Sequence, residues 1–247
     1  MAQFGSYNGS ADITDGVITI EGQTLAQESG VALILDDGSF GLKLNNRVEA
    51  NYGTPGYLST SLLYSDDTAG IMGGTGSFAF AQGYNVEASG YAATAQGYLC
   101  KSSGSMAFAQ GWNVESSGYA SAGFGTDNVV SGQMGFTAGR NNDVAGWYGT
   151  AVGVGLIQNS VGTVVVGQAN ATYTDTSGSP NVATAPVFIV GNGTVVNNDA
   201  GVRSDALIIR QGGQVEAPSL SEAEINAGDD KILVTKEWVL AQIALIP

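Results

Sequence analysis

Apolar and polar residues alternate in short runs along the middle of the chain. In Ser77–Gly83, the larger Phe78 and Phe80 alternate with the small Ala79 and Ala81. A period of two residues places successive side chains on opposite faces of an extended strand. The pattern therefore predicts short β strands, each followed by a glycine at which the chain turns.

This unit recurs every 14 residues. One row of glycines consists of Gly76, Gly90, Gly104, Gly118, Gly132 and Gly146, and a second row, seven residues out of phase, of Gly83, Gly97, Gly111, Gly125, Gly139, Gly153 and Gly167. Each glycine disfavours a helix by roughly 1 kcal/mol, whereas two strands joined by two turns fit the repeat length. We therefore expect an all-β chain with a parallel β-roll over 76–170, in which the glycines adopt the positive φ of turns. The last copy, Ser160–Asn170, is incomplete.

The two faces of the predicted strands differ in the size of their side chains. The row that contains Phe78 and Phe80 holds Phe, Ala, Met, Tyr, Thr and Val, and we expect it to fill the interior. The row that contains Ala79 and Ala81 is small enough for the backbone of another copy to approach. Because a thin coil buries little surface alone, we expect an intertwined homotrimer. A monomeric solenoid capped at both ends is the alternative.

The repeat resembles the heads of a known family. Ala79–Gly83 (AFAQG), Glu87–Gly90 (EASG) and Tyr91–Gly97 (YAATAQG) are similar to the head repeats of trimeric autotransporter adhesins. The resemblance covers Gly76–Gly167 and implies a left-handed parallel β-roll assembled as a trimer. It does not extend to the ends, where we see neither a coiled-coil stalk nor the strands of an outer-membrane anchor.

The sequence outside the roll indicates separate modules. Residues 1–75 read as a small β-rich region with a hairpin around Asp36–Ser39, and by analogy with fibres this region would attach to a particle. Residues 171–218 read as a polar loop, 171–186, followed by a β neck with strands at 187–190 and 206–209. Residues 219–247 contain capping-box spacing at Ser221–Glu224 and a short final helix over 235–246.

The C-terminal part has a resemblance of its own. Ser204–Pro218 and Asp230–Val239 (DKILVTKEWV) look like the ends of bacteriophage and prophage tail-fibre proteins. Those ends combine an apolar strand, a glycine-containing turn, a proline and a closing segment of this type. The resemblance implies a virion fibre, a spike or a related injection-system protein.

Composition and charge narrow the classes of function. The net charge of −14 argues against nucleic acid as a partner, because phosphates would be repelled. Nine acidic residues precede Gly76, four lie in 76–170 and nine follow, so the roll is poor in charge. The beginning lacks the regions of a signal peptide, and no apolar run is long enough to span a bilayer. We therefore expect no membrane insertion, synthesis in the host cytoplasm and display on the virion surface.

Catalytic and metal chemistry find little support. The chain has no His, the commonest general base. The pairs Asp36/Asp37, Asp66/Asp67 and Asp229/Asp230 lie beside turn-like residues and lack the alternating ligands of a calcium loop. Gly73–Gly76 lacks the lysine of a phosphate loop. The single Cys100 aligns with valines in the neighbouring repeats, which predicts a packing role. We expect no enzyme, no cofactor and no metal.

Two rows of aromatic residues are the candidate contact site. Tyr84, Tyr98 and Trp112 follow glycines of the second row, and Tyr91, Tyr119 and Trp147 follow glycines of the first. Such rows can stack on sugar rings or anchor interfaces, or else shield turns and fill grooves between protomers.

Together these features favour a trimeric phage fibre or spike whose partners are other virion proteins and a host surface glycan or outer-membrane protein. A structural decoration or collar component without a receptor, and a bacterial adhesin-like or injection-system fibre, are the alternatives.

Overall fold

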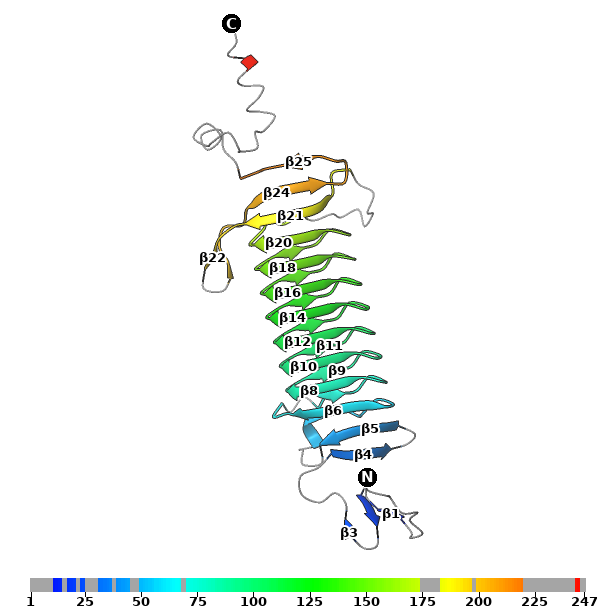
Figure 1. Ribbon diagram of the computed structural model, residues 1–247. Helices are drawn as coiled ribbons and strands as arrows, with labels where there is room; N and C mark the ends of the chain where they lie inside the picture. Colours follow the sequence, from blue (N-terminus) through cyan, green and yellow to red (C-terminus); the bar gives the residue numbers. More distant parts are fainter. Residues whose placement is uncertain are drawn as a thin grey trace, which may run out of the picture. The chain divides into compact units, whose positions relative to one another are not determined.

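The computed structural model describes residues 50–67, 70–173, 183–196, 201–219 and 243–244, and the backbone of residue 49 and of the strands at 11–14, 17–20, 23–24, 31–36, 39–44 and 199–200. These residues fall into two compact units, Met1–Met106 and Ala107–Pro247, which are described in turn. Strands dominate both units (Figure 1), so the all-β class is confirmed.

The first unit combines hairpins with parallel coils. Its strands are β1 (Ala11–Thr14), β2 (Val17–Ile20), β3 (Gln23–Thr24), β4 (Val31–Asp36), β5 (Ser39–Leu44), β6 (Ser59–Tyr64), β7 (Gly73–Gly74), β8 (Phe80–Tyr84), β9 (Glu87–Ala88), β10 (Thr94–Tyr98) and β11 (Lys101–Ser102), with a 3-10 turn at Glu49–Asn51. The antiparallel pair of β4 and β5 confirms the predicted hairpin. Parallel pairing then runs from β5 through β6 and β8 to β10, while β7, β9 and β11 form a second parallel ladder.

The second unit repeats the same coil. Its long strands are β12 (Phe108–Trp112), β14 (Ala122–Thr126), β16 (Phe136–Arg140), β18 (Thr150–Val154) and β20 (Val164–Gln168), and its short strands are β13 (Glu115–Ser116), β15 (Val129–Val130), β17 (Asp143–Val144) and β19 (Ile157–Gln158). Phe136 pairs with Ala122 and Thr150, each 14 positions away. Each coil thus contributes one long and one short strand, joined by turns at opposite edges (Figure 1). The predicted parallel solenoid with its 14-residue repeat is confirmed.

Antiparallel strands end the parallel stack of the second unit. Strand β21 (Pro186–Asn192) pairs in parallel with β20, and β24 (Asp205–Arg210) and β25 (Val215–Glu216) follow in antiparallel order. Strands β22 (Val195–Val196) and β23 (Asp199–Ala200) form a small hairpin. The strands predicted at 187–190 and 206–209 are therefore confirmed. Of the predicted helix over 235–246, only 243–244 lie within the described residues, and the predicted turn at 221–228 lies outside them.

Small residues fill the interior of the coils, which corrects the assignment of faces. Ala79 is 1% exposed and Ala81 is 0% exposed, whereas Phe78 is 45% exposed. Most buried positions of the coils hold Ala, Ser or Val, with Leu156 and Gln158 among the larger exceptions. Phe78 also has a left-handed backbone, with φ of 60°, and lies on the outside of a turn. The prediction that the larger row fills the interior and the small row faces another copy is wrong.

Side-chain volumes compensate one another across this narrow interior. Ala88 and Ser102 in the first unit are succeeded by Val130, Val144 and Gln158 at the same repeat position, all buried. The opposite position holds Ala79 in the first unit, Ser121 in the coil of Val130, and glycine at Gly135 and Gly149. A methyl group on Gly149 would overlap the amide of Gln158, and one on Gly135 would lie 2.8 Å from Val130. The larger buried Val144 and Gln158 are therefore accommodated by a glycine on the opposite side of their coils.

Both glycine rows let one coil approach the next, since a Cβ on Gly83 would overlap the Gly97 carbonyl oxygen, but the rows differ in backbone conformation. Gly83 has φ of +133°, as predicted for a turn glycine. Gly76 does not adopt a positive φ, and the prediction is wrong for its row. A Cβ on Gly76 would overlap the carbonyl of Gly90, so the first row allows one coil to approach the next. The left-handed turn positions are instead occupied by non-glycine residues such as Phe78 and Asn85.

A buried polar ladder holds the turns of the second unit. The amide of Asn142 donates to the Gly153 carbonyl at 3.0 Å and accepts from the Leu156 N–H at 2.9 Å. Asn128 makes the same type of contacts one coil earlier. In the first unit this repeat position holds Cys100, which is buried and 0% exposed. The predicted packing position of Cys100 is confirmed.

Candidate functional site

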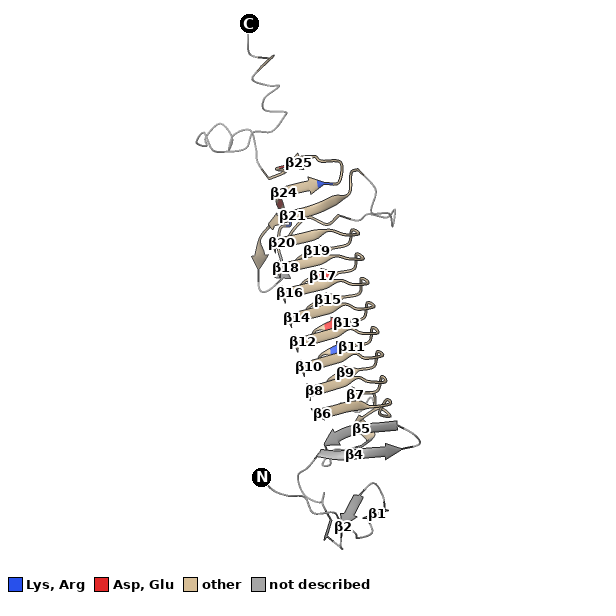
Figure 2. Cartoon of the chain, turned by 45° about the vertical axis from the view of Figure 1, so that its right-hand side comes forward, with Lys and Arg blue, Asp and Glu red and all other residues tan. Residues whose placement is uncertain are grey.

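Charge is scarce on the described coils and lies mostly on one side of them (Figure 2). Glu87, Lys101, Glu115 and Asp143 all belong to the short strands. The long strands carry Arg140 alone among the described residues of β8, β10, β12, β14, β16, β18 and β20. The outer face of the long strands is therefore suited to an apolar contact and the short-strand face to water.

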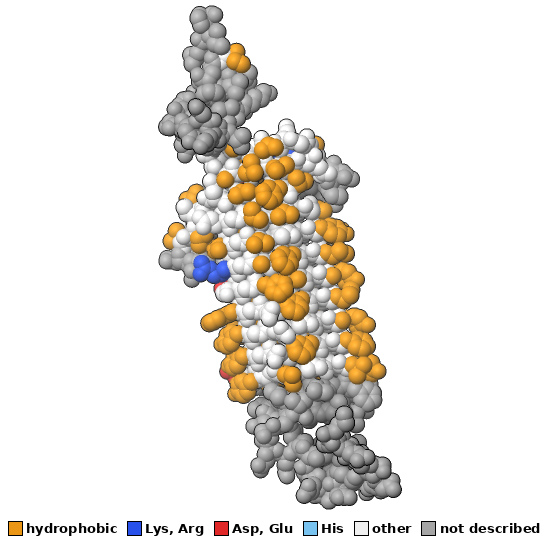
Figure 3. Space-filling view, in the orientation of Figure 1, with side chains coloured by type: hydrophobic (Ala, Val, Ile, Leu, Met, Phe, Trp, Pro, Cys, Tyr) orange, Lys and Arg blue, Asp and Glu red, His pale blue; other side chains and the backbone are white. Residues whose placement is uncertain are grey.

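The outer face of the long strands in the second unit is apolar. We call this the outer sheet face, and its apolar side chains are Phe108, Phe124, Phe136, Val152, Val164 and Val166. The Phe108 and Phe124 rings stack with their centroids 5.2 Å apart, and the Phe124 and Phe136 centroids are 5.8 Å apart. Phe136 is 37% exposed. Hydrophobic side chains follow one another from coil to coil as columns in this unit (Figure 3).

The first aromatic row forms a stack at one edge of the first unit. The rings of Tyr84 and Tyr98 are parallel within 3°, with centroids 4.9 Å apart. Tyr64 extends the stack at 5.8 Å from Tyr84. Sequence reasoning missed Tyr64 because it precedes the regular period. Because these rings cover one another's faces, the stack presents ring edges and hydroxyl groups, and a sugar cannot lie between Tyr84 and Tyr98. Trp112, of the same row, is 59% exposed in the second unit.

A carboxylate is fixed beside this stack. The Tyr84 hydroxyl donates to one oxygen of Asp66, and the Asn85 amide donates to the other at 2.8 Å. These hydrogen bonds, that of Tyr84 first, hold the pKa of Asp66 below its ordinary value. The same bond to Asp66 raises the pKa of Tyr84 to about 12. The Asp66 carboxylate thus orders a turn and the edge of the tyrosine stack.

The second aromatic row lies on the opposite turns. Tyr91 of the first unit packs edge to face on Phe78, which packs in the same way on Tyr57. Tyr119 and Trp147 of the second unit are 45% and 50% exposed. Tyr148, next to Trp147, is 55% exposed, and the repeat pattern missed it because its row was assigned to the interior.

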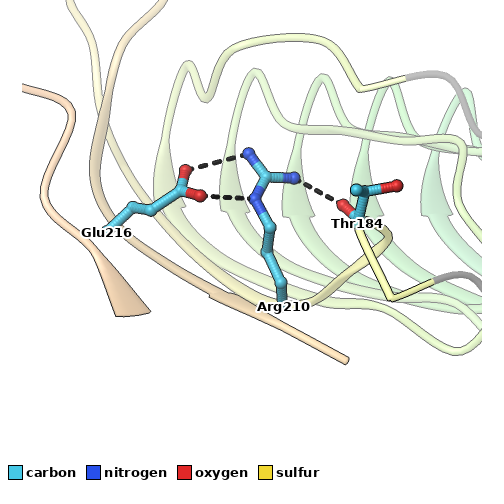
Figure 4. A network of polar contacts seen from close by, with 3 residues as sticks. All are labelled: Thr184, Arg210 and Glu216. Carbon is cyan, nitrogen blue, oxygen red and sulfur yellow. Dashed lines mark hydrogen bonds and ion pairs between the residues drawn. The ribbon is translucent and has the colours of Figure 1, made fainter. Parts of the chain in front are cut away.

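A polar network surrounds Arg210 at the end of the second unit (Figure 4). Its guanidinium binds Glu216 through two hydrogen bonds of 2.6 and 2.9 Å, and donates to the Thr184 carbonyl at 2.6 Å. The guanidinium also lies 5.7 Å from the centroid of the Tyr173 ring. These contacts satisfy the guanidinium within the chain, so we assign the network to closing the stack rather than to binding a ligand.

The buried Asp205 lies on the same terminal strand, β24. One of its oxygens accepts a hydrogen bond from the Ala171 N–H at 3.1 Å, and burial raises the pKa of its carboxyl. Among the described residues, no three His, Cys, Asp or Glu side chains come together as a metal site. Nor do the described residues include a helix long and apolar enough to cross a bilayer. Most of the polar loop predicted at 171–186 lies outside the described residues.

Comparison of the chain with protein-family models, with curated proteins and with solved structures found no match.

Proposed function

We propose that this chain is a virion structural protein, a trimeric phage fibre or spike that contacts the surface of the host cell and has no enzymatic activity. One observation carries the proposal: the coils bury mostly small or medium-sized side chains and present most of their aromatic side chains outward. Large apolar side chains in contiguous exposed groups are typical of interaction surfaces. An exposed site of this kind fits a protein that works by contact.

In the proposed trimer, the protomers contact one another through a different face of the coils from the one expected from the sequence. The small row faces the protomer's own interior, so it cannot receive a second backbone. The outer sheet face is apolar over consecutive coils, and another copy has the same coil spacing, so equivalent side chains can meet at every level. Three copies arranged around one axis would cover the three faces equally. The charged short strands would then face water.

The placement on a phage particle rests on resemblance. The adhesin-like head repeat favours an exposed fibre, and the tail-fibre-like segments at Ser204–Pro218 and Asp230–Val239 favour a virion or an injection system. The aromatic residues left exposed on the turns favour contact with a host surface over a purely structural decoration or collar, because a decoration needs only its contacts within the particle.

The proposal is tested on particles from the organism that carries the gene. Antibodies against the purified protein should label the outside of those particles in electron micrographs, and the purified protein should compete with them for adsorption to host cells. Absence of the protein from particles would overturn the virion assignment. Labelled particles without competition would instead assign the chain to a structural component.

A further inference from the structure

The turns that carry the second aromatic row form a distinct surface in the second unit. We call this surface the turn edge, and its members are Tyr119, Gln133, Met134, Trp147 and Tyr148, with Ser117 and Ser131 beside them. Tyr119, Trp147 and Tyr148 are about half exposed and Met134 is 46% exposed. No ring stacking is found for Tyr119, Trp147 or Tyr148 within the described part of the chain, unlike for Tyr84 and Tyr98.

The backbone holds these rings on a rigid support. The Met134 N–H donates to the Tyr119 carbonyl at 2.7 Å, and the Tyr148 N–H donates to the Gln133 carbonyl at 2.9 Å. Each turn is thereby tied to the next one, and successive aromatic side chains keep a fixed spacing set by the coils. A rigid aromatic support loses little conformational freedom when a ligand binds.

The groups around the rings are polar and neutral. The turns at 117–120, 131–134 and 145–148 contain no Asp, Glu, Lys or Arg. The exposed Ser117, Ser131 and Gln133 can donate and accept hydrogen bonds. Apolar ring faces flanked by neutral hydrogen-bonding groups match a pyranose, which has an apolar C–H face and a rim of hydroxyls. The chain's net charge of −14 disfavours acidic sugars.

The size of the turn edge distinguishes a glycan from a protein partner. A half-exposed Tyr or Trp leaves roughly 100 Å² of surface available, so three rings offer on the order of 300 Å². A stable protein interface needs about 800 Å² from each partner. The turn edge is too small for such an interface, whereas the larger outer sheet face can supply one.

We infer that the turn edge of the second unit binds a neutral glycan, whose sugar rings stack on Trp147, Tyr148 and Tyr119. The inference rests on the proposed contact with the host surface and names its ligand class. It also moves the contact from the stacked tyrosines of the first row to the second row.

The test is binding of the purified protein to an immobilised array of neutral and acidic oligosaccharides and bacterial polysaccharides. The double variant Trp147→Ala/Tyr148→Ala should lose the signal on neutral glycans by about tenfold or more. Val202→Ala is the control, since Val202 is also an exposed apolar residue of the second unit, at 71%, but lies outside both aromatic rows. It should bind within about twofold of the wild type, a difference of less than about 0.5 kcal/mol. Circular dichroism and light scattering establish that both variants keep the fold and mass.

The outcomes separate this inference from the proposed function. No binding to neutral glycans, binding to acidic glycans alone, or equal loss in Val202→Ala would each overturn the inference. If the protein still competes for particle adsorption in any of these cases, the host contact stands and its receptor is not a neutral glycan. If competition also fails, the receptor role itself is lost.

Discussion

Replacing Gly149 with alanine tests whether matched side-chain pairs pack the coils. The new methyl group would overlap the side-chain amide of Gln158, which is 1% exposed and has no room to move outward. Overpacking a tight interior costs about 1–3 kcal/mol. Displacing Gln158 also breaks the hydrogen bond from its amide to the Ser160 carbonyl, which contributes about 1 kcal/mol. We expect Gly149→Ala to lower the free energy of unfolding by about 2–4 kcal/mol.

A second substitution identifies the cause of that loss. The double variant Gly149→Ala/Gln158→Ala recreates the pair Ala79 and Ala88 of the first unit. It should be more stable than the sum of the two single changes predicts, by about 1–3 kcal/mol. Urea denaturation of the wild type, both single variants and the double variant measures this coupling. All four must be compared at one protomer concentration, because the stability of an oligomer depends on it.

If the losses of unfolding free energy in the two single variants add up to that of the double variant within about 0.5 kcal/mol, the matched packing of Gly149 and Gln158 is refuted. It would mean that Gly149 and Gln158 do not share a limited volume. The melting temperature gives a second readout, because each kcal/mol corresponds to about 2–4 °C in a protein of this size.

Four further predictions concern individual groups. Burial raises the pKa of Asp205 above its ordinary 3.8, so ionisation of this carboxyl lowers the stability of the folded chain as the pH rises from 3.8 through the raised pKa. Urea denaturation between about pH 4 and pH 7 measures this loss of stability. Asp205→Asn should make the stability depend less on pH in this range. Glu216→Gln should cost about 1 kcal/mol or less at pH 7, because its bidentate pair with Arg210 is partly exposed. Lys101→Gln, which removes a long ion pair of 3.7 Å whose lysine is half exposed, should change the urea midpoint by less than the error of the measurement. The Cys100 thiol should resist a thiol reagent in native protein and react fully in denaturant, and native labelling would contradict its burial.

The repeat fold could be predicted because its cause is local and periodic. The glycines of both rows and the alternation between them specify short strands at a constant spacing, and the hairpin of β4 and β5 follows from Asp36–Ser39 between two apolar runs. The strands β21 and β24 could also be predicted from local sequence, because each is an apolar run bounded by polar residues.

The faces could not be read from residue size. Large apolar side chains usually lie inside a protein, but the interior of this coil is limited by the separation of its two strands, which the sequence does not state. Ala81 therefore lies inside and Phe78 outside. The left-handed backbone of Phe78 was also hidden, because such a conformation is uncommon for a bulky residue.

The candidate site was predictable in part. The period aligned Tyr84 with Tyr98, and they do stack. The period could not identify Tyr64 or Asp66, because both residues lie before the regular repeat. It also could not show that the stacked rings cover one another's faces. Tyr148 was missed because its row was assigned to the interior.

The central claim is that the large apolar side chains outside the coils form a contact between copies of the chain. Light scattering of the purified protein tests it most directly. Two variants are compared, Phe136→Gln on the outer sheet face and Val129→Gln on the sheet of short strands. Their side chains are similarly exposed in the wild type, at 37% for Phe136 and 39% for Val129. We predict three times the chain mass of 25.1 kDa for the wild type and for Val129→Gln, and a lower mass for Phe136→Gln. A wild-type mass of a single chain, or an unchanged trimer in Phe136→Gln together with dissociation of Val129→Gln, would contradict the account.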